Sequence, residues 1–268
     1  MRSKATMLAI FLLLTHITVT AQIAISKEKV IQSTNVQFLE ELGKDATQRF
    51  IESKQKALKM ADEKGWVIRE DKDGRLRELI GVTPEGKPLY YITYNVDAAK
   101  STRANTLNIG GLLGLNLDGQ GMTAHVWDGG LALTTHQEYD GVGGTNRFSI
   151  GDGTTALHYH SAHVTGTIIA SGVVANSKGM APQAYAVGYD WNNDVGEATT
   201  AAGAGMLLSN HSYGYGAEDI SDAWFGQYGS DAVDWDELMY NAPYYLMCVA
   251  AGNDGDDNTS NAAPLDGN

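Results

Sequence analysis

The sequence has few of the residues that are typical of disulfide-rich or disordered proteins. It contains one cysteine and five prolines in 268 residues, whereas 43% of its residues are hydrophobic. A chain of this length and composition can bury a sizeable core. The single cysteine, Cys248, cannot form an internal disulfide bridge. It lies in the apolar run YYLMCVAAG, so we expect its side chain to be buried.

Long hydrophobic runs are also missing. The N-terminus reads MRSKATMLAIFLLLTHITVTAQ, in which Arg2 and Lys4 precede a short apolar run and small residues end at Ala21. This pattern predicts a secretory signal peptide over residues 1–21, cleaved after Ala21. A membrane anchor is the alternative, but the run is too short to cross about 30 Å of hydrocarbon and His16 interrupts it. We therefore expect a secreted protein without a transmembrane segment.

Positive charge is scarce after residue 100. Residues 1–100 contain 16 basic and 13 acidic residues, a net charge of +3, whereas residues 101–268 contain 3 and 19, a net charge of −16. Of the 31 glycines, 26 lie in this second part. The acidic part is therefore not expected to bind nucleic acid, and opposite charges favour docking of the basic part on it. We divide the chain into a signal peptide, a leader over residues 22–105 and a domain over residues 106–268.

The leader has the pattern of a small α+β unit. Apolar residues recur at three- and four-residue spacing between Asn35 and Lys64, which predicts one or two amphipathic helices. Two turn signals, Lys72–Gly74 and Pro84–Gly86, then separate apolar, β-branched runs and predict a hairpin region. A unit of this size is a small domain or a prosegment.

The acidic domain alternates between short apolar runs and helical patterns. The expected strands are Met122–Trp127, Ala184–Tyr189, Met206–His211 and Tyr244–Ala251, and the expected helices are Ala162–Ala175, Val195–Gly205 and Ser230–Asn241. This alternation predicts an α/β fold with a mostly parallel sheet and helices on both faces. In such sheets the active site lies beyond the carboxyl ends of the strands.

Polar residues stand at the ends of these strands and near a histidine-rich stretch. Asp128 ends the first strand, Asn253 follows the fourth, and the segment from Ser212 to Gly214 follows the third. A buried aspartate can orient an imidazole, and an asparagine can donate to an oxyanion. Taken singly, each of these residues is more often part of an ordinary turn than of a catalytic site. The stretch HYHSAHVTGTIIASG, from His158 to Gly172, supplies the imidazoles.

Together these motifs resemble the subtilisin-like serine peptidases. The stretch from His160 to Thr167 is similar to the family's H-G-T-H-V-A-G-T, and Asp128 begins a D-G-G string similar to its D-S/T-G. The string Ala250–Asn253 matches A-A-G-N, and Ser212-Tyr213-Gly214 resembles S-x-G. Gly129 stands where Ser or Thr is usual, and Ser161-Ala162 replace Gly-Thr. The resemblance covers about Leu115 to Asn258, and the leader resembles a propeptide in position and size.

The resemblance implies a role for each matched residue. His160 would be the general base, Asp128 would orient it and Asn253 would donate to the oxyanion, while Ser212, Tyr213 and Gly214 would bind an extended polypeptide substrate. His163 would be structural and would pack the helix, as would Val164, Ile168 and Ile169. The leader would be an inhibitory prosegment that docks on the domain and is removed near residues 100–115. No cofactor is needed for catalysis. Enzymes of the family often bind calcium for stability, and the acidic run Asp254–Asn258 could supply oxygen ligands, although such a run is more often a solvated loop.

The serine motif of the family, G-T-S-M-A, does not occur in the sequence. The nearest string is NTSNAAP from Asn258 to Pro264, but Ser260 follows Asn253 by only seven residues, too few for the intervening strands. We therefore expect the chain to be the N-terminal portion of a longer peptidase, with an incomplete catalytic domain.

Two other functions remain open at this stage. His158, His160 and His163 have the spacing of a zinc-binding H-x-H-x-D-H motif, although Ala162 replaces the aspartate, and a zinc-bound water would need no serine. The second alternative is a binding protein that keeps a peptidase scaffold without catalysis.

The missing serine gives a direct prediction. Residues 22–268, expressed alone, should hydrolyse neither casein nor ester substrates, because the base and its aspartate lack a nucleophile. Hydrolysis above a buffer blank that disappears in the His160→Ala variant would contradict this.

Overall fold

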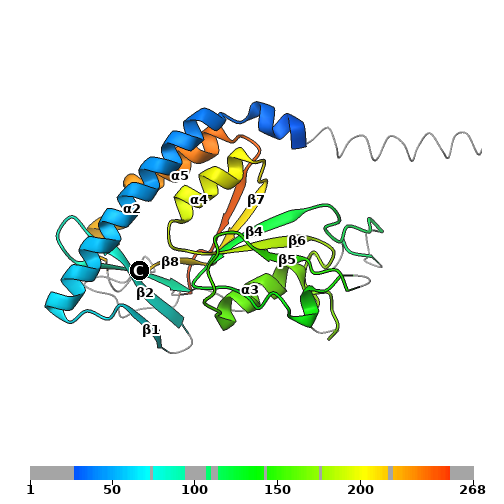
Figure 1. Cartoon of the computed structure of the whole chain (residues 1–268), viewed down its shortest axis with the longest axis horizontal. Helices are drawn as coiled ribbons and strands as arrows, with labels where there is room; N and C mark the ends of the chain where they lie inside the picture. The colour runs from blue at the N-terminus through cyan, green and yellow to red at the C-terminus, as the bar shows by residue number, and fades with distance from the viewer. Residues whose placement is uncertain are drawn as a thin grey trace, which may run out of the picture.

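The computed structural model describes residues 27–72, 75–93, 107–109, 114–141, 144–174, 177–216 and 220–253 (Figure 1). The predicted signal peptide, its cleavage after Ala21 and the acidic run Asp254–Asn258 lie outside these residues. Within them, no helix is long and apolar enough to cross a membrane.

The leader forms one long helix, α2 (Val36–Lys64), preceded by a short helix over residues 27–33. The Asn35 side chain caps the start of α2 by accepting a hydrogen bond from the Phe38 N–H at 3.3 Å. The helix ends at Gly65, which adopts a left-handed conformation with φ of 71° and donates its N–H to the Ala61 carbonyl. The apolar periodicity therefore predicted this helix correctly, with one uninterrupted element between the caps.

Three strands complete the leader: β1 (Arg69–Lys72), β2 (Arg75–Val82) and β3 (Pro88–Thr93). They pair antiparallel in sequence order, as the turn signals predicted. The fourth strand of this sheet is β8 (Tyr213–Tyr215), which comes from the acidic part of the chain and pairs with β3. One hydrogen-bonded sheet thus joins the leader to the rest of the protein.

The second sheet has five parallel strands in the order β5-β6-β4-β7-β9. These strands are β4 (Thr123–Asp128), β5 (Phe148–Ile150), β6 (Tyr185–Asp190), β7 (Leu208–His211) and β9 (Leu246–Val249). Sequence patterning predicted four of them to within a few residues, whereas β5 was missed because three residues are too short for a recognisable pattern. The chain enters the sheet at its centre, so β4 ends where the strand order reverses, which is where ligands bind in open α/β sheets.

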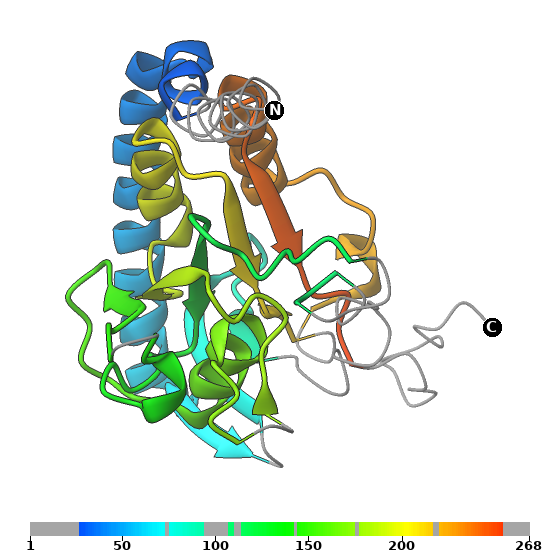
Figure 2. The same ribbon diagram turned by 90° about the vertical axis from the view of Figure 1, so that its right-hand side faces the viewer.

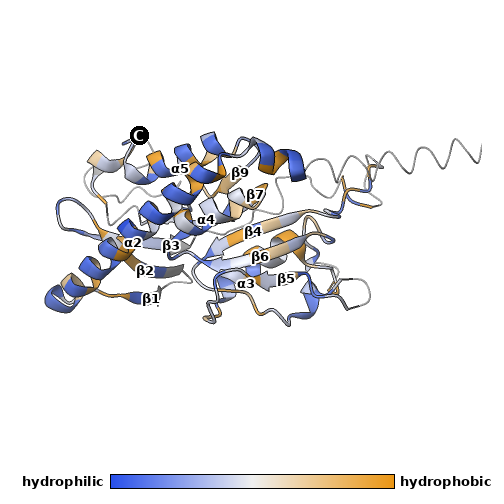
Figure 3. Ribbon diagram, turned by 45° about the horizontal axis from the view of Figure 1, so that its top comes forward, coloured by the Kyte–Doolittle hydropathy of each residue, from blue (hydrophilic) through white to orange (hydrophobic). Residues whose placement is uncertain are grey.

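Helices cover both faces of the parallel sheet, so the predicted mixed α/β architecture is confirmed. Helix α3 (Tyr159–Ile169) packs on β4 and β6 from one side. Helices α4 (Asp194–Gly203) and α5 (Ser230–Asn241) lie on the other side, and α2 runs alongside them (Figures 1 and 2). The main core joins all three of these helices to the sheet through Leu39, Leu42, Trp127, Trp191, Ala198, Ala202, Met206, Tyr213, Leu238, Ala242 and Tyr245. The side of α2 away from this core is mainly hydrophilic (Figure 3).

Cys248 is exposed, which corrects our expectation of a buried thiol. It lies on β9, one of the two edge strands of the parallel sheet. The residue before it, Met247, points to the opposite face and packs against the main core. The residues around it, Leu246 and Val249, are 57% and 58% exposed. An apolar run can therefore occupy a sheet edge with only one face covered.

The approach of α2 to α4 depends on two glycines, Gly43 and Gly196. A Cβ at Gly43 would clash with the Thr199 hydroxyl, and a Cβ at Gly196 would clash with the Thr47 hydroxyl. Thr199 cannot easily move, because it is 1% exposed and its hydroxyl donates to the Gly196 carbonyl at 2.8 Å. The missing side chains therefore let the two helix backbones come close together.

We predict that Gly43→Val lowers the free energy of unfolding by about 1–3 kcal/mol, because overpacking at this crossing outweighs the gain in helix propensity. Gly203→Val is the matched control, since the nearest atom to a Cβ there is 3.8 Å away. Urea titration measures both variants, and equal stability of the two would contradict the crossing argument.

Candidate active site

Asp128 and His160 meet at the carboxyl end of β4. His160 Nδ1 lies 2.8 Å from Asp128 Oδ1 and 2.9 Å from Oδ2. Asp128 is fully buried and His160 is 5% exposed. A carboxylate only accepts hydrogen bonds, so the imidazole carries its proton on Nδ1 and a neutral ring presents a lone pair at Nε2. This contact is the one that the resemblance implied, with Asp128 orienting the imidazole of His160.

The opposite nitrogen of the ring, His160 Nε2, is buried and has no hydrogen-bond partner among the described residues. Buried polar atoms are normally paired, and an unpaired one in a native structure calls for an explanation. An imidazole that is held through Nδ1 and carries a free lone pair at Nε2 is arranged to accept a proton.

The residues before α3 fix the position of this imidazole. His158 caps the helix, because its Nδ1 accepts from the His160 N–H at 3.2 Å, while its own N–H donates to the Leu131 carbonyl at 2.9 Å. Ser161 Oγ donates to the Gly130 carbonyl at 2.6 Å. Gly130 has φ of 126°, and a Cβ there would lie 3.0 Å from the His158 Cβ. The loop after β4 and the first turn of α3 are therefore clamped together around the Asp128–His160 pair.

The three histidines of the stretch from His158 to His163 do not point to a common site. His160 turns to Asp128 and His158 caps the helix, whereas the His163 side chain is exposed. This corrects the packing role that the resemblance implied for His163, while Val164 and Ile169 are buried as expected and Ile168 is partly buried. Within the described parts of the chain, no group of three or more His, Cys, Asp or Glu side chains is arranged to hold a metal ion.

The segment from Ser212 to Gly214 lies directly after β7, and it pairs with strand β3 of the leader. Gly214 pairs with Ile92, and Tyr213 pairs with Thr93, in antiparallel register. Ser212 Oγ accepts from the Asn210 side chain at 2.9 Å. This segment therefore holds an extended polypeptide backbone beside it, and in the structure that backbone is β3.

Asn253 follows β9 at the same edge of the sheet as Asp128. The strand leaves the sheet where the Ala250 N–H donates to the His211 carbonyl at 3.0 Å, and Gly252 then turns with φ of 96°. The Asn253 side chain is half-buried and makes no hydrogen bond to Asp128 or His160. The structure thus places this residue beyond β9 without a hydrogen bond to the pair.

A serine–histidine contact, separate from the Asp128–His160 pair, lies inside the fold, and sequence patterning did not single it out. Ser209 Oγ is 2.8 Å from His211 Nε2 and 2.6 Å from the Tyr245 hydroxyl, and His211 Nδ1 is 2.8 Å from the Tyr213 hydroxyl. Ser209 and His211 are 2% and 1% exposed, and burial lowers the pKa of His211 to about 3. Because substrate cannot reach it, this network is a structural one.

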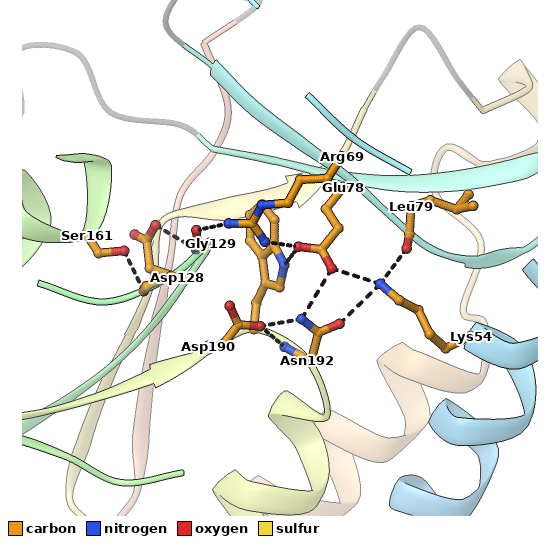
Figure 4. Close-up of polar contacts among 11 residues, drawn as sticks. Lys54, Arg69, Glu78, Leu79, Asp128, Gly129, Ser161, Asp190 and Asn192 are labelled. Atoms are coloured by element: carbon orange, nitrogen blue, oxygen red, sulfur yellow. Dashed lines mark hydrogen bonds and ion pairs between the residues drawn. The ribbon is translucent and has the colours of Figure 1, made fainter. Parts of the chain in front are cut away.

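A buried charge cluster joins the leader to this edge of the sheet. Glu78 on β2 is 7% exposed and accepts from Lys54 Nζ at 2.8 Å, from Arg69 and from the Trp191 indole at 3.1 Å. Arg69 also donates to the Gly129 carbonyl at 2.8 Å, next to Asp128 (Figure 4). Sequence reasoning missed this cluster; the only available signal was the hairpin register that places Arg69 opposite Glu78.

The comparisons with known proteins add no assignment. No protein-family model matches the sequence, and no significant match exists among curated proteins.

The charge cluster makes stability depend on pH. Burial raises the pKa of Glu78, but Lys54 and then Arg69 outweigh it, so the pKa lies below its usual 4.5. A lowered pKa contributes stability above pH 4.5 and loses it as the pH falls through the folded-state value.

We predict that Glu78→Gln lowers the free energy of unfolding by about 3 kcal/mol at pH 7, because two cations lose a buried partner. The gap between this variant and the native chain should narrow below pH 4.5 in urea titrations. The exposed Glu237→Gln is the control, and a gap of constant size at all pH values would contradict the prediction.

Proposed function

We propose that the protein is a secreted serine endopeptidase of the subtilisin type. The observation that carries the proposal is the buried Asp128–His160 contact, with a second imidazole nitrogen that has no partner among the described residues. In such an enzyme His160 takes the proton of a serine hydroxyl, and Asp128 holds the tautomer and stabilises the imidazolium that forms. The placement of the pair at the end of the central strand supports this role.

Peptide is the substrate class that the neighbouring strand supports. The segment from Ser212 to Gly214 pairs with an extended backbone in antiparallel register, and this is how a polypeptide is bound by strand addition. Asn253 would donate to the oxyanion of the tetrahedral intermediate after a shift that brings its amide over the substrate carbonyl. Calcium would serve stability only, and catalysis would need no cofactor.

The leader acts as an inhibitory prosegment in this proposal. Its strand β3 occupies the same segment that a substrate would use, and Arg69 binds the carbonyl of Gly129 beside Asp128. A substrate backbone and β3 cannot both pair with β8 along the same edge. Release of the leader would therefore precede turnover.

The nucleophile is the part of the proposal that a gene can test. The 268 residues contain no G-T-S-x-A string. The proposal therefore requires that the complete reading frame encode one after Asn268, and a complete gene without it would overturn the proposal in favour of a non-catalytic scaffold.

The full-length product should hydrolyse casein and react with a fluorophosphonate probe at the serine of that string. We predict that His160→Ala lowers kcat/KM at least about a hundredfold, because the proton of the serine loses its acceptor. Asp128→Asn should act in the same direction, because an amide N–H facing Nδ1 favours the wrong tautomer.

His163→Ala is the matched control, since this histidine is exposed on the same helix. Full activity of His160→Ala, or loss of hydrolysis with EDTA without any reaction with the fluorophosphonate probe, would contradict a serine mechanism and favour a metal-dependent one.

A further inference from the structure

A large cavity lies on the face of the sheet opposite α3, away from the Asp128–His160 pair. Its volume is about 970 Å³, and its walls come from β4 and β6, from α4, and from the leader residues Thr47 and Lys27. Figure 1 shows α4 and α2 together above this face of the sheet. A volume of this size is ample for a small organic ligand.

Glycines keep much of this wall free of side chains. Gly121, Gly151, Gly196 and Gly205 all line the cavity. A Cβ at Gly151 would clash with the ring of Tyr189, so the absence of a side chain lets that ring lie against the backbone. The backbone thus approaches the cavity closely, as it does where a ligand must fit.

One wall is a flat aromatic surface. The ring of Tyr189 stacks on Trp127 with centroids 4.2 Å apart and an interplanar angle of 10°, and His125 stacks beside it at 5.8 Å and 18°. His125 Nδ1 lies 3.2 Å from the Tyr189 hydroxyl. Burial lowers the pKa of His125 to about 4, so the imidazole is neutral at pH 7 and brings no positive charge to the wall.

Two acceptor atoms at the cavity have no donor among the described residues. Glu197 on α4 uses one oxygen to accept from the Trp127 indole at 2.9 Å, and no described residue donates to its other oxygen. The Asn193 side-chain oxygen is buried and has no partner among the described residues. An acceptor that is buried without a donor is a cost that a ligand donor removes.

The electrostatic field at Glu197 favours a cation. Burial raises the pKa of Glu197 to about 8; the hydrogen bond from Trp127 opposes this rise, and the charges of Asp152, Asp194 and Asp190 add to it. At pH 7 the carboxyl is therefore mostly protonated before a ligand binds. No cation in the described part of the chain forms an ion pair with it. Lys27 lies beside Gly205, past the end of α4, whereas Glu197 is in the first turn, roughly 10 Å away along the helix. A bound cation would favour the ionised carboxylate.

We propose that this cavity binds a small organic cation, namely a primary amine carried on a flat apolar body. The ammonium group would donate to Glu197 and to the Asn193 oxygen, and the apolar body would lie against Tyr189 between the glycines. The leader closes part of the cavity through Thr47, so the bound amine would also stabilise the leader in its docked position. This site is independent of the proposed peptidase activity, because none of its residues belongs to the Asp128–His160 pair.

Isothermal titration calorimetry of the chain with phenethylamine tests the proposal at pH 7. We expect saturable binding to one site, and binding of 2-phenylethanol that is at least tenfold weaker, because that alcohol has the same body without the charge. Glu197→Gln should weaken phenethylamine binding about tenfold, which corresponds to roughly 1.4 kcal/mol, while its amide oxygen still accepts from Trp127. Glu237→Gln, on the exposed side of α5, should leave binding unchanged.

Asn193→Gly provides a second variant that does not threaten the fold. Asn193 has φ of 69°, which glycine adopts without strain, so the substitution removes the side-chain amide without straining the backbone. Phenethylamine should bind this variant several-fold more weakly. The proposal is overturned if phenethylamine does not bind at millimolar concentration, if 2-phenylethanol binds equally well, or if neither Glu197→Gln nor Asn193→Gly weakens binding.

Discussion

The complete burial of the Asp128 carboxylate is the constraint on which the candidate active site depends. A buried charge is tolerated only where hydrogen-bond donors surround it, and here the donors are His160 Nδ1 and the N–H of Gly129 at 2.7 Å. These two hydrogen bonds fix the conformation of the loop after β4, the position of the start of α3 and the orientation of the imidazole. Because Nδ1 of His160 binds Asp128, the other ring nitrogen, Nε2, points away from the aspartate.

Three different kinds of contact hold the leader and the acidic domain together, each in a different part of the interface. At the helices the contact is apolar, since Leu39 and Leu42 of α2 enter the main core. At the sheet it is backbone pairing between β3 and β8. Near the site it consists of hydrogen bonds, from the Trp191 indole to Glu78 and from Arg69 to the Gly129 carbonyl. The charge division visible in the sequence bears on a different contact, the ion pair between Arg49 of α2 and Asp234 of α5, so it indicated docking without indicating where the strongest contacts lie.

Local patterns predicted the elements well, and long-range contacts account for what was missed. The periodicity of α2 and α5 gave their bounds, and the contact between Asp128 and His160 was implied by the resemblance of their motifs to a known family. Strand β8 could not be predicted, because three residues carry no pattern and its partner lies in the leader. Cys248 was assigned to the interior from its apolar neighbours and His163 from the resemblance, yet exposure depends on which faces of β9 and α3 other elements cover. The cavity residues come from at least five separate segments and share no local motif.

The pairing of β3 with β8 also sets an order of events during synthesis. Ile92 is opposite Gly214, so the leader sheet cannot gain its fourth strand until some 120 further residues have been made. At ribosomal speeds of about 5–20 residues per second, that delay is roughly 6–25 s. Over this interval the hydrogen-bonding edge of β3 stays open to other extended chains, and an unpaired edge is a site of misassociation. Early folding of α2 over the hairpin would shorten the time for which the hairpin is exposed, but it would not cover the unpaired edge of β3.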